Sequence, residues 1–115
     1  MRTEQAFEAA RRVAERNREV SISVSAVLFD RSGKVVAIGR NKRLAGRGRL
    51  GQHTIHAEVD VVSRVRKPSS NLTLVLYRRG AKVITPCSGC SKVLRSYGVS
   101  VCFHTTGSGV ARMDV

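Results

Sequence analysis

The chain has 115 residues, of which 42% are hydrophobic, as is typical of one globular domain. We therefore expect a single domain over residues 1–115. No apolar run approaches the ~20 residues that a membrane-spanning helix needs, so we expect no membrane partner. The 21 Lys and Arg residues against 8 acidic residues give a formal net charge of +13, and such a surface attracts polyanions, including nucleic acid.

The first part of the chain predicts a helix and then a β-hairpin. Residues 4–18 form an amphipathic pattern, because apolar side chains recur at steps of three and four residues: Phe7, Ala10, Val13 and Ala14. Residues 22–29 are rich in β-branched and apolar side chains and predict a buried strand. The turn sequence at 30–33 then leads into a second strand at 34–39.

The middle of the chain predicts a basic loop, a helix and a third strand. Residues 40–51 carry several arginines and glycines and no apolar periodicity, which indicates a loop. A helix is expected to begin near His56 and to stop before Pro68, because proline disfavours helical geometry in the residue before it. Its expected inward side chains are Val59, Val62 and Val65. Residues 72–77 then alternate and predict a strand.

The last part of the chain predicts a helix between strands. After a loop at 78–84, a helix is expected to begin at the cysteines and to end at Gly98, a residue type that favours the position after a helix. Residues 99–104 predict a strand, and a tight turn leads to a final strand at 110–115. The order helix–strand–strand–helix–strand–helix–strand–strand predicts an α/β fold. We expect a three-layer α/β/α sandwich around a five-stranded mixed sheet.

Two short motifs carry the chemistry. The first is His56-Ala57-Glu58, and the second is Pro86-Cys87-Ser88-Gly89-Cys90. His56, Cys87 and Cys90 supply three ligands of the types that zinc prefers, which leaves the fourth tetrahedral position open to water, as in catalytic sites. Helix N-termini also favour thiolates. The sequence therefore predicts one Zn²⁺ per chain, with Glu58 close by but outside the ligand set.

These motifs, in this order and with proline before the first cysteine, resemble the cytidine and deoxycytidylate deaminase superfamily of zinc-dependent nucleobase deaminases. The resemblance implies a hydrolase acting on the C–N bond of a cyclic amidine. In that reaction a zinc-activated water attacks C4 of cytosine, and Glu58 acts as the proton shuttle. The expected product is uracil in a cytidine or deoxycytidine nucleoside or nucleotide.

The resemblance also implies substrate contacts. Asn41, which ends the first hairpin, corresponds to a residue that hydrogen-bonds a sugar hydroxyl; its alternative role is that of a turn residue. The backbone N–H of Ala57 is expected to meet the pyrimidine carbonyl, and the backbone C=O of Thr85 to accept from the exocyclic amine. The tight Gly-Ser-Gly turn before the last strand is similar to the branch that includes free cytidine deaminases.

Basic residues surround the predicted site. The candidate phosphate-binding residues flank Asn41: Arg40, Lys42, Arg43, Arg47 and Arg49. Arg78, Arg79 and Lys82 precede the cysteine motif and are expected near the same rim. This charge keeps a single-stranded DNA or RNA substrate as an alternative, although aromatic residues, on which strand binders stack bases, are only 4% of the chain. A further alternative is a non-catalytic, zinc-stabilised nucleic-acid-binding module.

Other cysteines and histidines leave structural alternatives open. His53 or His104 as a fourth ligand would make a closed, structural zinc site, and the Cys-x-x-Cys spacing also occurs in redox pairs. We expect Cys102 to lie in the core and His104 to lie at the surface. An odd count of three cysteines, with two in the motif, implies no disulfide framework and a reducing compartment. We expect a cytoplasmic homo-oligomer, with the nucleus as the alternative location in a eukaryotic host.

Overall fold

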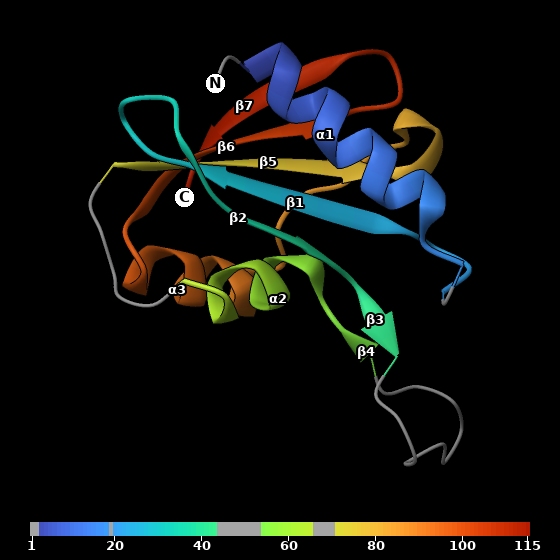
Figure 1. Ribbon diagram of the computed structural model, residues 1–115, viewed down its shortest axis with the longest axis horizontal. Helices are drawn as coiled ribbons and strands as arrows, with labels where there is room; N and C mark the ends of the chain where they lie inside the picture. Colours follow the sequence, from blue (N-terminus) through green and yellow to red (C-terminus); the bar gives the residue numbers. More distant parts are fainter. Residues whose placement is uncertain (1–2, 19, 44–53, 66–70) are drawn as a thin grey trace.

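The computed structural model describes residues 3–18, 20–43, 54–65 and 71–115 (Figure 1). Within these ranges the elements follow the expected order, with two additional short strands and one short 3-10 helix. Their bounds are α1 Thr3–Arg16, β1 Val24–Phe29, β2 Val35–Arg40, β3 Lys42–Arg43, β4 Thr54–Ile55, α2 Ala57–Ser63, β5 Leu72–Arg78, η2 Arg79–Ala81, α3 Ser88–Ser96, β6 Val99–Thr105 and β7 Val110–Asp114. No helix in the described part of the chain is long and apolar enough to cross a membrane.

The main sheet is mixed and has the strand order β2-β1-β5-β6-β7. Strand β1 pairs antiparallel with β2 and with β5, β5 pairs parallel with β6, and β6 pairs antiparallel with β7. The parallel pair requires a crossover, which α3 supplies, because it lies between β5 and β6 in the chain. The short turn after β6 instead returns the chain directly as an antiparallel edge strand, as expected for a hairpin ending.

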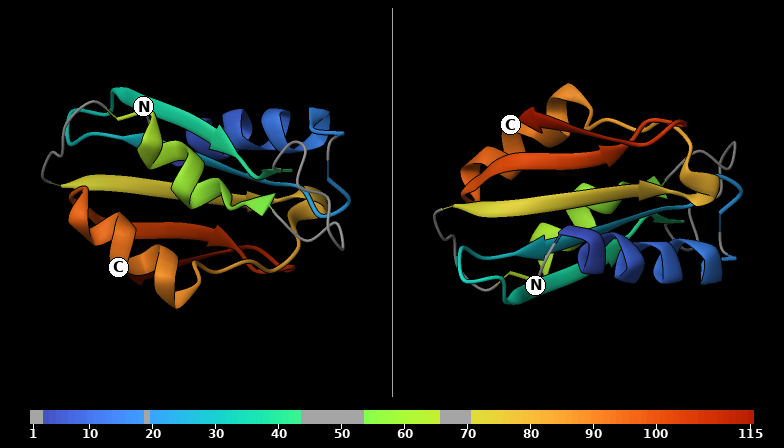
Figure 2. Two further views of the ribbon diagram at one scale, coloured as in Figure 1. Left: turned by 90° about the horizontal axis from the view of Figure 1, so that it is seen from below. Right: turned by 90° about the horizontal axis from the view of Figure 1, so that it is seen from above.

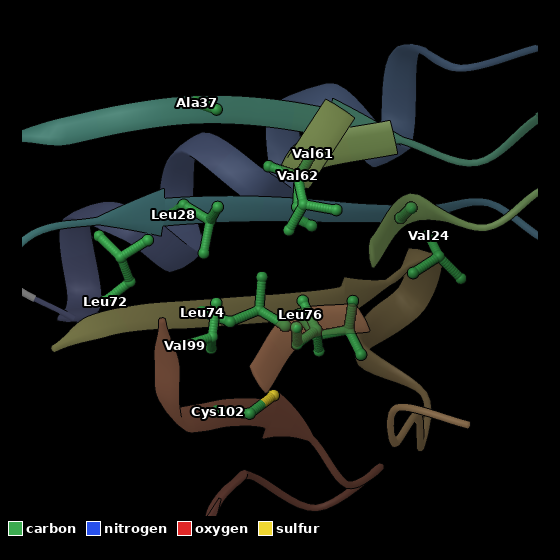
Figure 3. Close-up of a cluster of buried hydrophobic side chains, with 13 residues drawn as sticks. Val24, Leu28, Ala37, Val61, Val62, Leu72, Leu74, Leu76, Val99 and Cys102 are labelled. Carbon is green, nitrogen blue, oxygen red and sulfur yellow. The ribbon is translucent and has the colours of Figure 1, made fainter. Parts of the chain in front are cut away.

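Helices cover both faces of this sheet, which confirms the three-layer α/β/α sandwich. Helix α1 lies on one face, and α2 and α3 lie side by side on the other (Figures 1 and 2). The larger apolar cluster fills the space between the sheet and the α2–α3 layer (Figure 3). Its fully buried members include Leu28, Leu74, Leu76 and Leu94. A smaller cluster, which includes Val27, Val75 and Tyr77, lies beneath α1.

Helix α1 packs closely on the sheet because its inner face consists of alanines. Ala6, Ala10 and Ala14 are fully buried, so the helix backbone lies near the strands. The Oγ of Ser25 donates a hydrogen bond to the carbonyl of Ala10, and the Oγ of Ser23 donates one to the carbonyl of Ala14 at 2.5 Å. These buried serines therefore find partners in the helix backbone, as buried hydroxyls must.

Helix α2 lies against β2 at a position that only glycine can occupy. A Cβ added at Gly39 would lie 2.6 Å from the backbone nitrogen of Val61 and 2.8 Å from its Cα. Such distances are well inside van der Waals contact, so a side chain here would push the strand and helix apart. Gly39 thus sets the distance between β2 and the helix that carries the first motif.

The expected strands and helices are found, with boundaries shifted by a few residues, but the predicted loop 40–51 is partly structured. Lys42 and Arg43 pair antiparallel with Ile55 and Thr54 to form a two-stranded ladder, β3–β4. A two-residue ladder of mainly polar side chains has no alternation long enough to be recognised in the sequence. At the other end of α3, Gly98 has φ 91°, which confirms it as the residue that terminates this helix.

Two expected side-chain positions are wrong. Val59 was expected to point inward, yet it is 38% exposed, whereas Val61 and Val62 are buried. The buried face of α2 holds Ala57, Glu58, Asp60 and Val61 beside the expected Val62, and it leaves Val59 outside. His104 was expected at the surface and is only 7% exposed. The chain before α3 follows the end of β6 here: Ile84 N–H donates to Thr105 O at 3.1 Å.

Candidate metal centre and active site

The two motifs meet at the N-terminal ends of α2 and α3. His56 immediately precedes α2 and Cys87 immediately precedes α3, each with an extended backbone, while Cys90 lies in the first turn of α3. The Cys90 N–H donates to the Cys87 sulfur at 3.2 Å, so this thiol caps the helix. Because α2 and α3 lie on the same face of the sheet (Figure 2), their first turns bring the histidine and both cysteines together.

The three side chains are spaced as zinc ligands are. His56 Nδ1 lies 3.3 Å from Cys90 Sγ and 3.7 Å from Cys87 Sγ. Tetrahedral zinc with Zn–N near 2.0 Å and Zn–S near 2.3 Å would hold N and S about 3.5 Å apart. All three ligand atoms lie within 4.8 Å of one another. The predicted trio is therefore placed to hold one metal ion.

The electrostatics of the trio also favour a bound cation. Burial raises the pKa of the Cys90 thiol, and the neighbouring Cys87 and the Glu58 carboxylate raise it further. Two thiols and a carboxylate crowded together resist ionisation unless a positive charge compensates them. A zinc ion supplies that charge and favours deprotonated thiols. The residues present thus fit Zn²⁺, in their geometry and in their chemistry.

Glu58 lies beside this trio and is itself buried. Only 5% of the residue is exposed. Burial raises the pKa of Glu58, while hydrogen bonds from its own backbone N–H, from the Cys90 thiol and from the Cys87 N–H lower it in part. The carboxylate is outside the group of metal-binding atoms. It therefore lies next to the metal-binding trio as a separate, buried ionisable group.

A pocket of about 370 Å³ opens over these groups, within the volume range of small-molecule sites. The residues Asn41, Ala57 and Thr85, which were expected to contact substrate, all line it. Its walls also contain apolar residues that the sequence analysis did not single out: Ile22, Val24 and Ile84. Each lies at a strand end or in a connecting segment, and only the fold shows that these segments converge.

Asn41 is held at the wall of this pocket by its own hydrogen bonds. Its Oδ1 accepts from the Val24 N–H at 2.9 Å, and its Nδ2 donates to the Ile22 carbonyl at 2.7 Å. Its backbone carbonyl accepts from Nδ2 of the buried Asn17 at 2.8 Å. The amide therefore joins the end of β2 to the start of β1. This structural role coexists with its position in the pocket lining.

The structure places the basic residues around Asn41 in different environments. Lys42 Nζ lies 2.8 Å from Oδ1 of the buried Asp60. One guanidinium nitrogen of Arg40 donates to Asn17 Oδ1 at 3.0 Å. Neither residue lines the pocket that contains Glu58. The side chain of Arg43 and all of Arg47 and Arg49 lie outside the described residues, so their expected role as phosphate ligands stays a prediction.

A closed zinc site is not formed by the residues that the structure describes. In those ranges, His56, Cys87 and Cys90 are the histidine, cysteine and carboxylate residues that come together, and His104 is not among them. His53 lies outside the described residues. Cys102 is fully buried in the larger apolar cluster, as expected. The described ligand set thus leaves a coordination position for water.

Comparisons with known proteins agree with this site. Residues 1–105 match the model of the cytidine and deoxycytidylate deaminase zinc-binding region. No curated protein sequence matches the chain significantly.

Solved structures agree with the fold. Cytidine deaminase from Burkholderia pseudomallei superposes with a TM-score of 0.70 at 22% identity, over 99% of this chain and 93% of that one. Cytidine deaminase from Mycobacterium leprae superposes with a TM-score of 0.65 at 17% identity, over 97% of this chain and 93% of that one. Cytidine deaminase from Mycobacterium tuberculosis superposes with a TM-score of 0.67 at 21% identity, over 90% of this chain and 85% of that one. With its ligand trio assembled and most of its length matched by the family model, this chain belongs to the cytidine and deoxycytidylate deaminase zinc-binding family.

Proposed function

We propose that this protein hydrolytically deaminates cytosine to uracil in a cytidine or deoxycytidine nucleoside or nucleotide, with Glu58 as the proton carrier. The observation that carries the proposal is the position of Glu58. Its carboxylate is buried, forms part of the pocket wall and lies against Cys90 and Cys87 of the metal-binding trio. Family membership gives deamination in general, and this geometry supports Glu58 as the residue that carries the protons.

The proposed proton transfers use Glu58 on both sides of the reaction. A water molecule adds its oxygen to C4 of the ring while Glu58 accepts its proton and delivers it to N3. Glu58 then takes the remaining hydroxyl proton and passes it to the exocyclic amine. The C4–N bond breaks, ammonia leaves and C4 becomes a carbonyl. Zinc held by His56, Cys87 and Cys90 supplies Lewis acidity that lowers the pKa of the attacking water.

Other pocket residues are suited to hold the base in place. Ala57 lines the pocket next to Glu58, so its N–H is suited to meet the pyrimidine carbonyl. The carbonyl of Thr85, which lines the same pocket, is suited to accept from the amine. Ile22, Val24 and Ile84 give the ring apolar walls, which exclude bulk water and strengthen the polar contacts. Asn41 is assigned to a sugar hydroxyl.

An ammonia-release assay of the zinc-loaded protein tests this proposal. Cytidine, deoxycytidine monophosphate and a short cytosine-containing single-stranded oligonucleotide are compared under identical conditions, with adenosine as a control base. We expect turnover of cytidine or of the monophosphate and none of adenosine. Turnover of the oligonucleotide alone would make the protein a polynucleotide deaminase. Bound zinc with no turnover of any cytosine compound would show a non-catalytic zinc module and reject the proposal.

A further inference from the structure

A second cleft lies directly beside the cytosine pocket. It has a volume of about 360 Å³, and its lining residues are Ser21, Ile22, Ser23, Arg78, Arg79, Gly80 and Lys82. Ile22 also lines the pocket over Glu58. This side chain is 55% exposed, so it forms a low apolar wall shared by the two cavities. A ligand that fills the pocket and extends past Ile22 therefore enters the second cleft.

The walls of this cleft are fixed by backbone hydrogen bonds. The Arg79 N–H donates to the Ser23 carbonyl at 2.8 Å, which joins η2 to the segment that leads into β1. These two segments lie side by side at the same end of the sheet (Figure 2). Arg78 and Lys82 form an antiparallel bridge across the η2 turn. The basic side chains are thus held on a defined turn next to the pocket.

Among the described residues, the cleft carries positive charge without a compensating acid. The part of its lining that the structure describes contains three basic residues and no carboxylate. Arg79 donates to the carbonyls of Ala14 and Asn17 at the end of α1 and so has a structural role. Arg78 uses one guanidinium nitrogen on the Val83 carbonyl at 3.3 Å, and Lys82 is exposed. Among the described residues, neither Arg78 nor Lys82 pairs with a carboxylate.

The position of this charge distinguishes it from the general basicity of the chain. Another basic cavity, lined by Arg16, Arg18 and Arg40, shares no lining residue with the cytosine pocket. Only a charge that adjoins the pocket can act on the same substrate molecule as Glu58. A guanidinium and an ammonium together match a phosphate group, since the first donates in a planar fork and the second is a compact point charge.

We propose that Arg78 and Lys82 bind a phosphate group of the nucleotide whose cytosine occupies the pocket, so that the preferred substrate is phosphorylated rather than a free nucleoside. This rests on the proposed function for the identity of the base. The phosphate has two sources, a free mononucleotide or the backbone of a single strand. The shared chemistry is a nucleotide phosphate adjacent to the pyrimidine sugar, beyond Ile22.

Binding of the expected products tests this proposal without requiring turnover. The zinc-loaded protein is titrated calorimetrically with uridine, uridine 5′-monophosphate and a short single-stranded oligouridylate. We expect Lys82→Glu, and separately Arg78→Gln, to weaken the binding of a phosphorylated ligand about tenfold or more. This is the loss of affinity expected when a charge-assisted contact is removed. The affinity for uridine should change less than about twofold, because uridine has no phosphate. If the variants lose affinity for the monophosphate alone, the substrate is a free nucleotide. If they lose affinity for the oligouridylate alone, the substrate is a strand.

The matched control is Arg31→Glu. Arg31 is exposed and lies in the turn between β1 and β2, at the end of these strands away from Asn41, so this variant removes the same charge far from the cleft. Equal weakening by Arg31→Glu would show a general charge effect and overturn the proposal. So would equal weakening of uridine, or a wild-type protein that binds the phosphorylated ligands no better than uridine. Failure of ammonia release with retained phosphate selectivity would reject the proposed reaction alone.

Discussion

Lys42 and the buried Asp60 form an ion pair that fixes the chain next to Asn41. Lys42 Nζ lies 2.8 Å from Asp60 Oδ1, while Asp60 Oδ2 accepts from the Arg40 N–H at 3.0 Å. One carboxylate on α2 therefore holds the residues on both sides of Asn41. The side chain of Asp60 is 3% exposed and that of Lys42 is 31% exposed, so this pair is shielded from water on the carboxylate side.

Replacement of Asp60 by asparagine should destabilise the fold. Asp60→Asn removes the ion pairs with Lys42 and Arg64 and weakens the bond from the Arg40 N–H. We expect a loss of about 2–3 kcal/mol in the free energy of unfolding. Urea denaturation of the zinc-loaded proteins measures it. Asp114→Asn is the matched control, because the Asp114 side chain is 90% exposed. Equal stability of the two variants would contradict a structural role for Asp60.

The same carboxylate should make stability depend on pH. Burial acts to raise the pKa of Asp60, but the Lys42 hydrogen bond and the Arg40 N–H outweigh it, so the pKa is lowered on folding. Because the pKa is lower in the folded state, the ionised carboxylate stabilises the fold at pH values above its pKa in the unfolded state. This stabilisation is lost as the pH falls through the pKa in the folded state. The stability difference between wild type and Asp60→Asn should therefore shrink below about pH 4. Zinc release in acid affects both proteins and cancels in this difference; a constant difference would refute the assignment.

Glu58→Gln should keep zinc and lose turnover. Glutamine has nearly the same shape and can still hydrogen-bond, but it cannot carry the proton, so we expect a fall in kcat of about 100-fold or more. Metal content is measured in parallel by atomic absorption. A variant that keeps near-normal turnover of the cytosine substrate would remove Glu58 from the reaction.

His56→Ala should lose the metal and, with it, stability. Two thiols alone hold zinc weakly, and metal binding contributes to folding in small domains. We expect substoichiometric zinc and a lower melting temperature that added zinc restores only in part. Wild-type protein treated with a chelator provides the comparison, because it lacks the ion but keeps His56. Full zinc content in His56→Ala would show that this imidazole is no ligand.

Gly39→Ala should separate β2 from α2. The new Cβ would lie within 3 Å of the backbone and Cβ of Val61, and overpacking of this kind costs about 1–3 kcal/mol. Gly109→Ala is the control, since nothing lies within 4 Å of a Cβ there. Thermal unfolding compares the two variants. If both melted alike, the close approach of strand and helix would not be a constraint.

The element order and the zinc ligands could be predicted because their signals are local. Each strand and helix has its own periodicity, and His56, Cys87 and Cys90 lie in short motifs whose spacing is typical of helix starts. The prediction failed where a residue's position depends on another segment. Val59 is exposed because Glu58 and Ala57 occupy the inner face of α2, a choice that apolar periodicity does not contain.

Pairings between distant residues could not be predicted from the sequence for the same reason. Nothing near Lys42 indicates that Asp60, on a different element, takes its charge, and the walls formed by Ile22 and Ile84 come from segments far apart in the chain. His104 is buried, and the segment before α3 bonds to the neighbouring Thr105 through the Ile84 N–H; both features appear only in three dimensions.

The burial of Cys102 leaves Cys87 usable as a reporter of metal occupancy. Cys102 is fully buried, and burial, aided by the charge of Glu58, raises its pKa to about 12. Such a thiol is unreactive toward alkylating agents near neutral pH. Cys90 is also buried with a raised pKa, so labelling of the folded protein is expected at the exposed Cys87. The number of labels per chain then gives the fraction of molecules without an ion.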